Sequence, residues 1–168
     1  MNTIINFILS MIPYISLAIL FTVIIRYIIY KKTNKLDIKY EINLIIFIGF
    51  ITGLFSQTLK VGNESMINLI PFGIIGPTIN NLIKYKYITP FLINILGNII
   101  MFIPIGYFIP RLWKVENKRV ILIGFCISLF IEISQLFLNR TTDVDDLILN
   151  TLGTIIGLLI YKSIKKDN

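Results

Sequence analysis

The chain of 168 residues contains no histidine and a single cysteine, Cys126. Without histidine it lacks the side chain that most often acts as a general base near neutral pH, and also the commonest protein ligand of transition metals. One cysteine can form neither an internal disulfide nor a thiolate metal cluster. We therefore expect no metal site and no cofactor.

Charged side chains are also scarce. They make up 15% of the residues, whereas soluble domains have about 25%. Hydrophobic residues make up 55%, and the mean hydropathy is +0.81. A soluble domain of this length is not so apolar, and the composition therefore predicts a membrane protein.

Five apolar segments are long enough to cross a bilayer, for which a helix needs roughly 20 residues. They cover about residues 5–29, 42–59, 91–110, 120–138 and 144–161. The first has no basic residues before it and no small-residue cleavage site, so we expect a retained helix rather than a signal peptide. The sequence predicts an all-α fold, a polytopic membrane helix bundle with five transmembrane helices.

The basic residues predict the orientation of this bundle, because Lys and Arg concentrate in cytoplasmic loops. Eleven of the sixteen follow the first, third and fifth spans, four lie on the other side, and Arg26 can extend to the side of the eleven. We expect an N-terminus outside and a C-terminus inside the plasma membrane of a bacterium. Basic clusters beside helix ends suit anionic lipids, so we expect membrane lipids as partners and no nucleic acid.

Residues 61–90 are partly apolar but are interrupted at Pro71, Gly73, Gly76 and Pro77. A broken helix would leave backbone groups unpaired in lipid. We expect an interrupted segment at the outer surface, interfacial or partly re-entrant, rather than a sixth span. The chain then has two parts that form one structural unit: residues 1–60 with two transmembrane helices and residues 61–168 with three.

Polar residues in the last three predicted spans recur at three- and four-residue steps, which places each set on one helical face. Asn98, Glu132 and Asn150 each lie seven residues from the predicted outer end of their span, a depth of roughly 10 Å. Such residues usually face the bundle interior. We therefore predict a ligand pocket in the outer half of the bundle, with no residue assigned to catalysis. The candidate pocket residues are Asn94, Asn98, Glu132, Gln135, Arg140, Asp143, Asp146 and Asn150.

Structural roles compete with this interpretation. The asparagines could merely hydrogen-bond between helices. Residues 142–145 fit a capping box, and helix capping alone could explain Asp143, Asp145 and Asp146. Glu132 is harder to explain, because a carboxylate inside a span costs about 2.5–3.5 kcal/mol to insert. Small residues favour close helix contact, and the candidates for such packing are Gly97, Gly106, Gly153 and Gly157.

Three runs of sequence resemble the VanZ-like family of bacterial membrane proteins. They are NLIPF at 68–72, NILGNIIMFIPIGYFIP at 94–110 and EISQLFLNRTTDVDDLILNTLGTIIG at 132–157. Their elements, in order, are N-x-x-G-N, F-x-P-x-G, E-x-x-Q, R-x-x-D-x-D-D and N-x-x-G-x-x-x-G. The resemblance implies low-level resistance to teicoplanin-type glycopeptide antibiotics. The motif residues that it carries over are the candidate pocket residues, the four glycines and Pro104.

Three kinds of function are compatible with these features, and the oligomeric state is undetermined. We favour a non-catalytic binder of a lipid-linked cell-wall precursor or of a glycopeptide antibiotic at the outer face. Its carboxylates would take a cationic group, and Arg140 would take a phosphate or carboxylate. A membrane-embedded enzyme is a second possibility, with Mg²⁺ or Ca²⁺ held by carboxylates and a lipid-linked phosphate as substrate. A lipid or precursor transporter is a third, although no internal repeat is visible.

Overall fold

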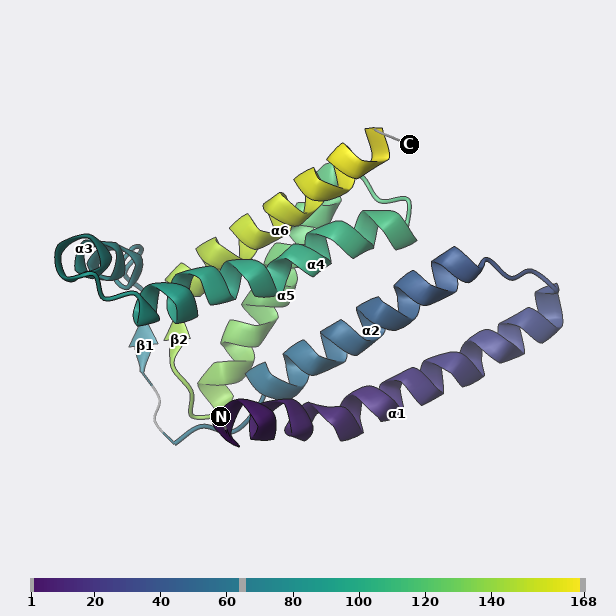
Figure 1. Ribbon diagram of the computed structural model, residues 1–168, viewed down its shortest axis with the longest axis horizontal. Helices are drawn as coiled ribbons and strands as arrows, with labels where there is room; N and C mark the ends of the chain where they lie inside the picture. Colours follow the sequence, from purple (N-terminus) through teal and green to yellow (C-terminus); the bar gives the residue numbers. More distant parts are fainter. Residues whose placement is uncertain (1, 64–65, 167–168) are drawn as a thin grey trace. The chain divides into compact units, whose positions relative to one another are not determined.

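The computed structural model describes residues 2–63 and 66–166, which form helices joined by short connections and one pair of two-residue strands (Figure 1). The elements are α1 (Asn2–Thr33), α2 (Ile38–Thr58), β1 (Ile67–Asn68), α3 (Ile75–Tyr85), the π-helix η1 (Phe91–Leu96), α4 (Gly97–Leu112), α5 (Asn117–Phe137), β2 (Thr142–Asp143) and α6 (Val144–Lys166). Contacts divide the chain into two compact units, Met1–Lys60 and Val61–Asn168. That these units act as one structural unit stays a prediction.

Five helices in the described part of the chain are long and apolar enough to cross a membrane. They are Ile8–Thr33, Ile38–Thr58, Phe91–Leu112, Asn117–Phe137 and Val144–Lys166. Each coincides with a predicted span, and the third joins η1 to α4 without a break. The prediction of an all-α, five-helix, polytopic membrane bundle is therefore confirmed, while its orientation in the membrane stays a prediction.

The first unit is a hairpin of α1 and α2. A Cβ atom added to Gly49 of α2 would lie 3.6 Å from Ile15 Cγ2 of α1, and one added to Gly53 would lie 3.4 Å from Ile15 Cδ1 and 3.5 Å from Met11 Sδ. The contact at Gly49 is of ordinary van der Waals length, and those at Gly53 are barely tighter. The two helices therefore pack through side chains, and their contact does not depend on glycine.

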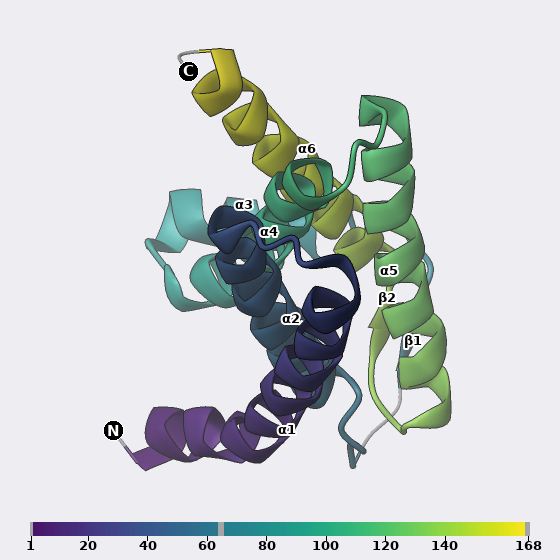
Figure 2. The ribbon, with the colours of Figure 1, turned by 90° about the vertical axis from the view of Figure 1, so that its right-hand side faces the viewer.

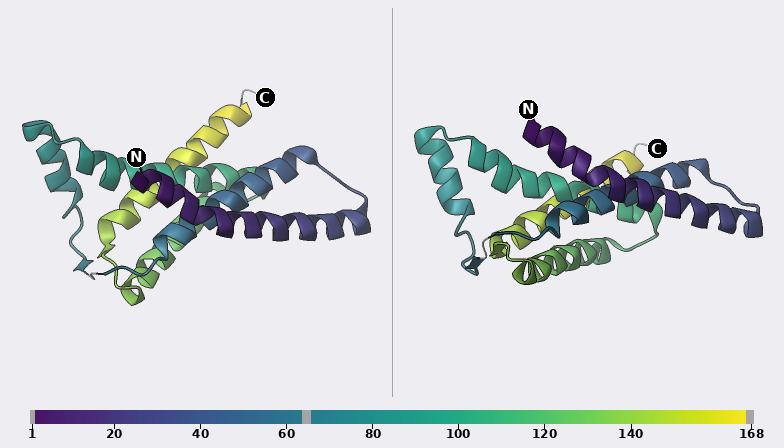
Figure 3. Two further views of the ribbon diagram at one scale, coloured as in Figure 1. Left: turned by 60° about the horizontal axis from the view of Figure 1, so that its bottom comes forward. Right: turned by 90° about the horizontal axis from the view of Figure 1, so that it is seen from below.

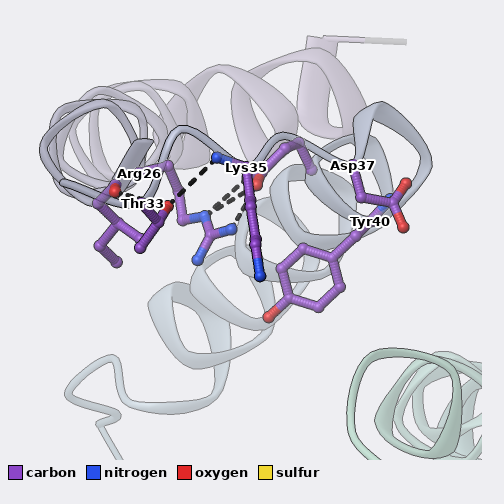
Figure 4. Close-up of polar contacts among 7 residues, drawn as sticks. Arg26, Thr33, Lys35, Asp37 and Tyr40 are labelled. Atoms are coloured by element: carbon purple, nitrogen blue, oxygen red, sulfur yellow. Dashed lines mark hydrogen bonds and ion pairs between the residues drawn. The ribbon is translucent and has the colours of Figure 1, made fainter. Parts of the chain in front are cut away.

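An ion pair fastens the hairpin near its loop (Figure 4). Arg26 Nε donates to Glu41 Oε2 at 2.8 Å and to Oε1 at 3.1 Å, and Nη2 donates to the same carboxylate. The guanidinium also lies over the ring of Tyr40, with Cζ 5.1 Å from the ring centroid. Asp37 begins α2 by accepting a hydrogen bond from Tyr40 N at 3.2 Å. The charge of Arg26 is thus compensated within the unit.

The second unit is built on α4, α5 and α6 (Figure 2). α4 and α6 run side by side and parallel, since Gly153 faces Ile99 and Gly157 faces Ile103 one turn further along both helices. α5 runs antiparallel to α6, because Glu132, near its end, bonds to the residue just before α6. Three successive spans alternate in direction in this way, as the predicted topology requires.

Glycine sets the distance between these helices. A Cβ at Gly106 would overlap Thr154 O of α6, and a Cβ at Gly153 or Gly157 would overlap a backbone oxygen of α4. Side chains larger than hydrogen do not fit at such backbone contacts. Gly97 differs from its predicted role, because its only near neighbour is Leu92 O of the same helix, at 3.5 Å. No atom of α6 lies within 4 Å of a Cβ placed at Gly97, so this glycine does not mediate the contact between α4 and α6.

The segment 61–90 combines a strand, a turn and a helix. β1 pairs in parallel with β2, and the N–H of Thr142 donates to Met66 O at 2.9 Å. α3 then folds back beside the start of η1 (Figure 3). Although Pro77 was expected to interrupt helix, it lies in the first turn of α3, where its missing N–H is not needed. Within residues 67–90 the chain is therefore non-helical before α3 and again at 86–88, between α3 and η1.

We predict that Gly157→Ala destabilises the second unit by about 1–3 kcal/mol, the usual effect of overpacking. The added methyl group would meet Ile103 O and force α4 away from α6. Thermal unfolding of the purified protein in detergent measures the change.

Gly76→Ala is the matched control. A Cβ at Gly76 meets nothing within 4 Å, and alanine favours helix at this position in α3. Its unfolding temperature should equal or exceed that of the native chain. Equal unfolding temperatures for Gly157→Ala and Gly76→Ala would contradict a glycine-dependent contact.

Candidate functional site

The candidate residues gather at the end of the second unit where η1 and α6 begin and α5 ends. Four of the eight are buried, with exposed fractions of 3% for Glu132, 7% for Gln135, 3% for Asp143 and 4% for Asn150. Three are half-buried and one is exposed. Half of the predicted pocket residues are therefore buried inside the second unit. The half-buried residues are Asn98, Arg140 and Asp146, and the exposed one is Asn94.

Glu132 points into the unit and joins α5 to the start of α6. Its Oε2 accepts a hydrogen bond from the N–H of Asp143 at 2.9 Å. Its backbone oxygen accepts another from Thr142 Oγ1 at 3.2 Å. A buried carboxylate needs such donors, because an unpaired one is costly to desolvate. Glu132 therefore belongs to a fixed hydrogen-bonded cluster.

Asp143 caps α6, which corrects the predicted capping box. Its Oδ1 accepts from the N–H of Asp145 at 2.9 Å, the bond expected of a residue just before a helix. Thr142, the predicted cap, instead bonds to α5: its hydroxyl donates to the backbone carbonyl of Glu132. The capping box was wrong because Thr142 lies in β2, one residue before the position that a cap requires.

Asp145 holds the turn that precedes α3. Its carboxylate is 1% exposed and accepts three backbone hydrogen bonds, from Phe72 N, from Ile74 N at 2.8 Å and from Ile75 N at 3.0 Å. Phe72 has a φ of 63°, a conformation rare for a bulky residue. The carboxylate compensates for that strain by accepting hydrogen bonds from backbone groups on both sides of the turn.

Sequence reasoning did not select Asp145 or Asn68 as site residues. Asn68 Nδ2 donates to Asp143 Oδ2 at 3.2 Å, and its Oδ1 accepts from Ile70 N at 3.2 Å. The sequence feature that could have drawn attention to Asp145 is its position next to Asp146, a candidate pocket residue. Two consecutive residues of a helix face different directions, and the two carboxylates here bond to different segments of the chain.

The hydrogen bonds also correct the predicted common depth of three residues. Asn98 Nδ2 donates to Asp146 Oδ1, whereas Asn150 Nδ2 donates to Ser128 Oγ at 2.9 Å. Ser128 lies one turn before Glu132 in α5, and Asn150 lies one turn after Asp146 in α6. The polar residues therefore form two layers one turn apart. The prediction was wrong because it counted from helix ends and could not include the axial shift between helices.

Two buried oxygens keep an unused acceptor position. Of the side chains that the structure describes, those with a buried polar atom lacking a hydrogen-bond partner are Gln135, at Oε1, and Asn150, at Oδ1. Such atoms are rare in folded proteins and call for a specific explanation. Together with Glu132 they make the interior of the cluster rich in acceptors.

A family model described as VanZ/LLP1 matches residues 12–165 of the chain. The chain belongs to the VanZ/LLP1 family. The match includes most of α1 and all of α2, whereas the motifs seen in the sequence begin only at residue 68. No curated protein and no solved structure matches the chain significantly. Five helices in its described residues are long and apolar enough to span a membrane, and this VanZ/LLP1 protein is a multi-pass membrane protein.

The donors and acceptors of this VanZ/LLP1 site define its chemistry. Within residues 2–63 and 66–166, no three His, Cys, Asp or Glu side chains are arranged to hold a metal ion. The carboxylates of Asp143 and Asp145 are occupied by backbone and amide N–H groups. Asp146 and Asn98 remain half-buried at the edge of the cluster. The arrangement can accept hydrogen bonds from an N–H-rich or cationic group that approaches this edge.

We predict that Asp145→Asn loosens the turn before α3. An amide offers one acceptor oxygen, and its N–H₂ faces backbone donors, so at least one N–H of residues 72–75 loses its partner. A hydrogen bond to a charged group contributes about 1.5–3 kcal/mol. Hydrogen exchange at Phe72, Ile74 and Ile75 should accelerate accordingly, as measured by mass spectrometry on the purified protein.

Asp37→Asn is the control for the same change. Asp37 caps α2 with one bond to Tyr40 N, and asparagine caps helices equally well. Exchange in α2 and in the turn should stay as in the native chain. Unchanged protection of the turn in Asp145→Asn would show that the carboxylate does not hold it.

Proposed function

We propose that this VanZ/LLP1 protein binds a lipid-linked cell-wall precursor or a glycopeptide antibiotic at the outer face of the bacterial plasma membrane, without catalysis, and so contributes low-level teicoplanin-type resistance. The site is the polar cluster at the common end of η1, α5 and α6. Its position outside follows from the distribution of basic residues, which concentrate after the first, third and fifth spans.

The observation that carries the proposal is the surplus of buried acceptors. Gln135 and Asn150 each keep an amide oxygen without a donor, and Glu132, which lies one helical turn before Gln135 in α5, is 3% exposed. A cluster with this composition favours a ligand that brings donors, such as the ammonium group or peptide N–H groups of a stem peptide or glycopeptide. Asp146 and Asn98, both half-buried, are the first groups that such a ligand would meet.

Binding without chemistry fits the same residues better than catalysis does. The described side chains include no group of metal-binding residues, and the sequence has no histidine to act as a base. The carboxylates of Glu132, Asp143 and Asp145 are already hydrogen-bonded to backbone N–H groups. These bonds preorganise a rigid receptor, which lowers the entropic cost of binding.

We predict that Glu132→Gln weakens this function and leaves the fold intact. The glutamine oxygen can still accept from Asp143 N, but the negative charge that attracts a cation is lost. Binding of a fluorescent teicoplanin-type glycopeptide or of a lipid-linked precursor to the purified protein should weaken about 10- to 100-fold, the effect of losing one charged hydrogen bond. Tolerance of cells to the antibiotic should fall at unchanged protein abundance.

Glu116→Gln serves as the matched control. Glu116 precedes α5, its side chain is 77% exposed, and its partner is the equally exposed Arg119. Exposed pairs of this kind contribute little. Binding and tolerance should match those of the native protein. Equal binding by Glu132→Gln and the native chain, at equal abundance, would refute the proposed site.

We also predict that the two ends of α5 lie on opposite sides of the membrane. In a chain with Cys126 replaced by alanine, Thr141→Cys should react with an impermeant maleimide added to intact cells, because it follows α5 on the proposed outer side. Asn117→Cys, at the start of α5, should react only after permeabilisation. Both residues are exposed in the structure. The reverse pattern would place the polar cluster inside the cell.

A further inference from the structure

We infer that the opposite end of the second unit carries a separate binding site for the phosphate of an anionic phospholipid headgroup, in a cavity between the last turns of α4 and α6. The cavity has a volume of about 250 Å³ and is lined by Arg111, Tyr161, Ile164 and Lys165. The cavity is therefore far larger than the roughly 10–15 Å³ needed to hold a single water molecule.

Two cations reach this cavity from different helices. Arg111 lies in the last turn of α4 and Lys165 in the last turn of α6. The helices are parallel, so both residues belong to the same end of the unit. A guanidinium and an ammonium that converge on one cavity suit an oxyanion with several acceptor oxygens, and phosphate is the usual ligand of this kind.

Aromatic rings hold both cations in place. The Arg111 guanidinium lies 5.6 Å from the centroid of Tyr107, and the Lys165 ammonium lies 5.8 Å from that of Tyr161. The two rings pack edge to face between the helices, with centroids 6.4 Å apart. Cation–π contacts restrict the side chains without neutralising their charge. The cations are therefore preorganised for an anion.

Stabilisation of helix ends does not account for this arrangement by itself. A cation in the last turn compensates the helix dipole wherever it lies around the axis. Here one cation from each helix faces the same cavity, over rings that contact each other. The convergence of the two charges, rather than their presence, is what points to a ligand.

The surroundings favour a lipid over free phosphate. Helices α4 and α6 are membrane spans, so their ends lie at the boundary of the bilayer. Ile164 gives the cavity an apolar wall and is 42% exposed, and Trp113, 42% exposed, follows α4 at the level where indole rings meet headgroups. A phospholipid can place its phosphate between the cations and its acyl chains along the apolar helix surface.

Trp113 is the only tryptophan of the chain and provides the readout. The full chain is reconstituted into two kinds of phosphatidylcholine vesicle. One contains phosphatidylglycerol that carries a doxyl quencher at acyl carbon 5, and the other contains the same mole fraction of phosphatidylcholine with the same label. We expect phosphatidylglycerol to quench Trp113 more strongly. Arg111→Gln combined with Lys165→Gln should reduce this preference about ten- to thirtyfold, the effect of removing two basic groups beside an anionic lipid.

Two further variants separate the cavity from general charge. Arg119→Gln combined with Lys162→Gln removes the same charges from the same two types of residue, but neither residue lines the cavity. This pair should keep the preference. Exchanging the cations, Arg111→Lys with Lys165→Arg, should also keep it, because both positive charges remain at the cavity.

Three outcomes would overturn the inference. The first is equal quenching by the two lipids in the native chain. The second is an equal loss of preference in both charge-removing pairs, which would indicate diffuse attraction to the surface. The third is release of phosphatidylglycerol by inorganic phosphate at constant ionic strength, which would assign the cavity to free phosphate.

Discussion

The contact between α4 and α6 is the constraint on which the second unit depends. Glycine at positions 106, 153 and 157 lets the two backbones touch, and it fixes their parallel register along about two turns of α4. At one end this register places Asn98 against Asp146. At the other end it places Tyr107 against Tyr161. Both proposed sites are therefore consequences of one helix contact, because neither pair would meet if one helix slid by a turn.

A second requirement of the unit is to supply hydrogen-bond partners for the irregular backbone between β1 and α3. The N–H groups of the turn between β1 and α3 have no helix or strand partners, so other protein groups must accept their hydrogen bonds. Asp145 accepts three of the N–H groups, and β1 pairs with β2. A buried carboxylate at the start of α6 is itself favoured by the helix dipole. The polar cluster thus has a structural role, and only its unused acceptors argue for a ligand.

Local sequence contains enough information for some of this structure and not for the rest. Runs of about 20 apolar residues determine the five spans, because each helix satisfies its backbone internally. Residues 91–112 could be recognised in this way despite Pro104 inside the helix. The bonds of Asp145 to Phe72 and Ile74 join positions more than 70 residues apart, and no periodicity records such a pairing. The pairing of Asn150 with Ser128 depends on an axial shift that residue spacing does not contain.

The two ends of the α4–α6 pair also show how far helix dipoles explain the charge pattern. A positive helix start attracts Asp145 and Asp146, and a negative helix end attracts Arg111 and Lys165, so segregated charge needs no ligand. The dipole does not, however, require Asp145 to bond to the backbone of another segment. It also does not require two cations to share a cavity, or Gln135 to bury an acceptor without a donor. These three features, which helix dipoles do not produce, are the ones that indicate ligand binding.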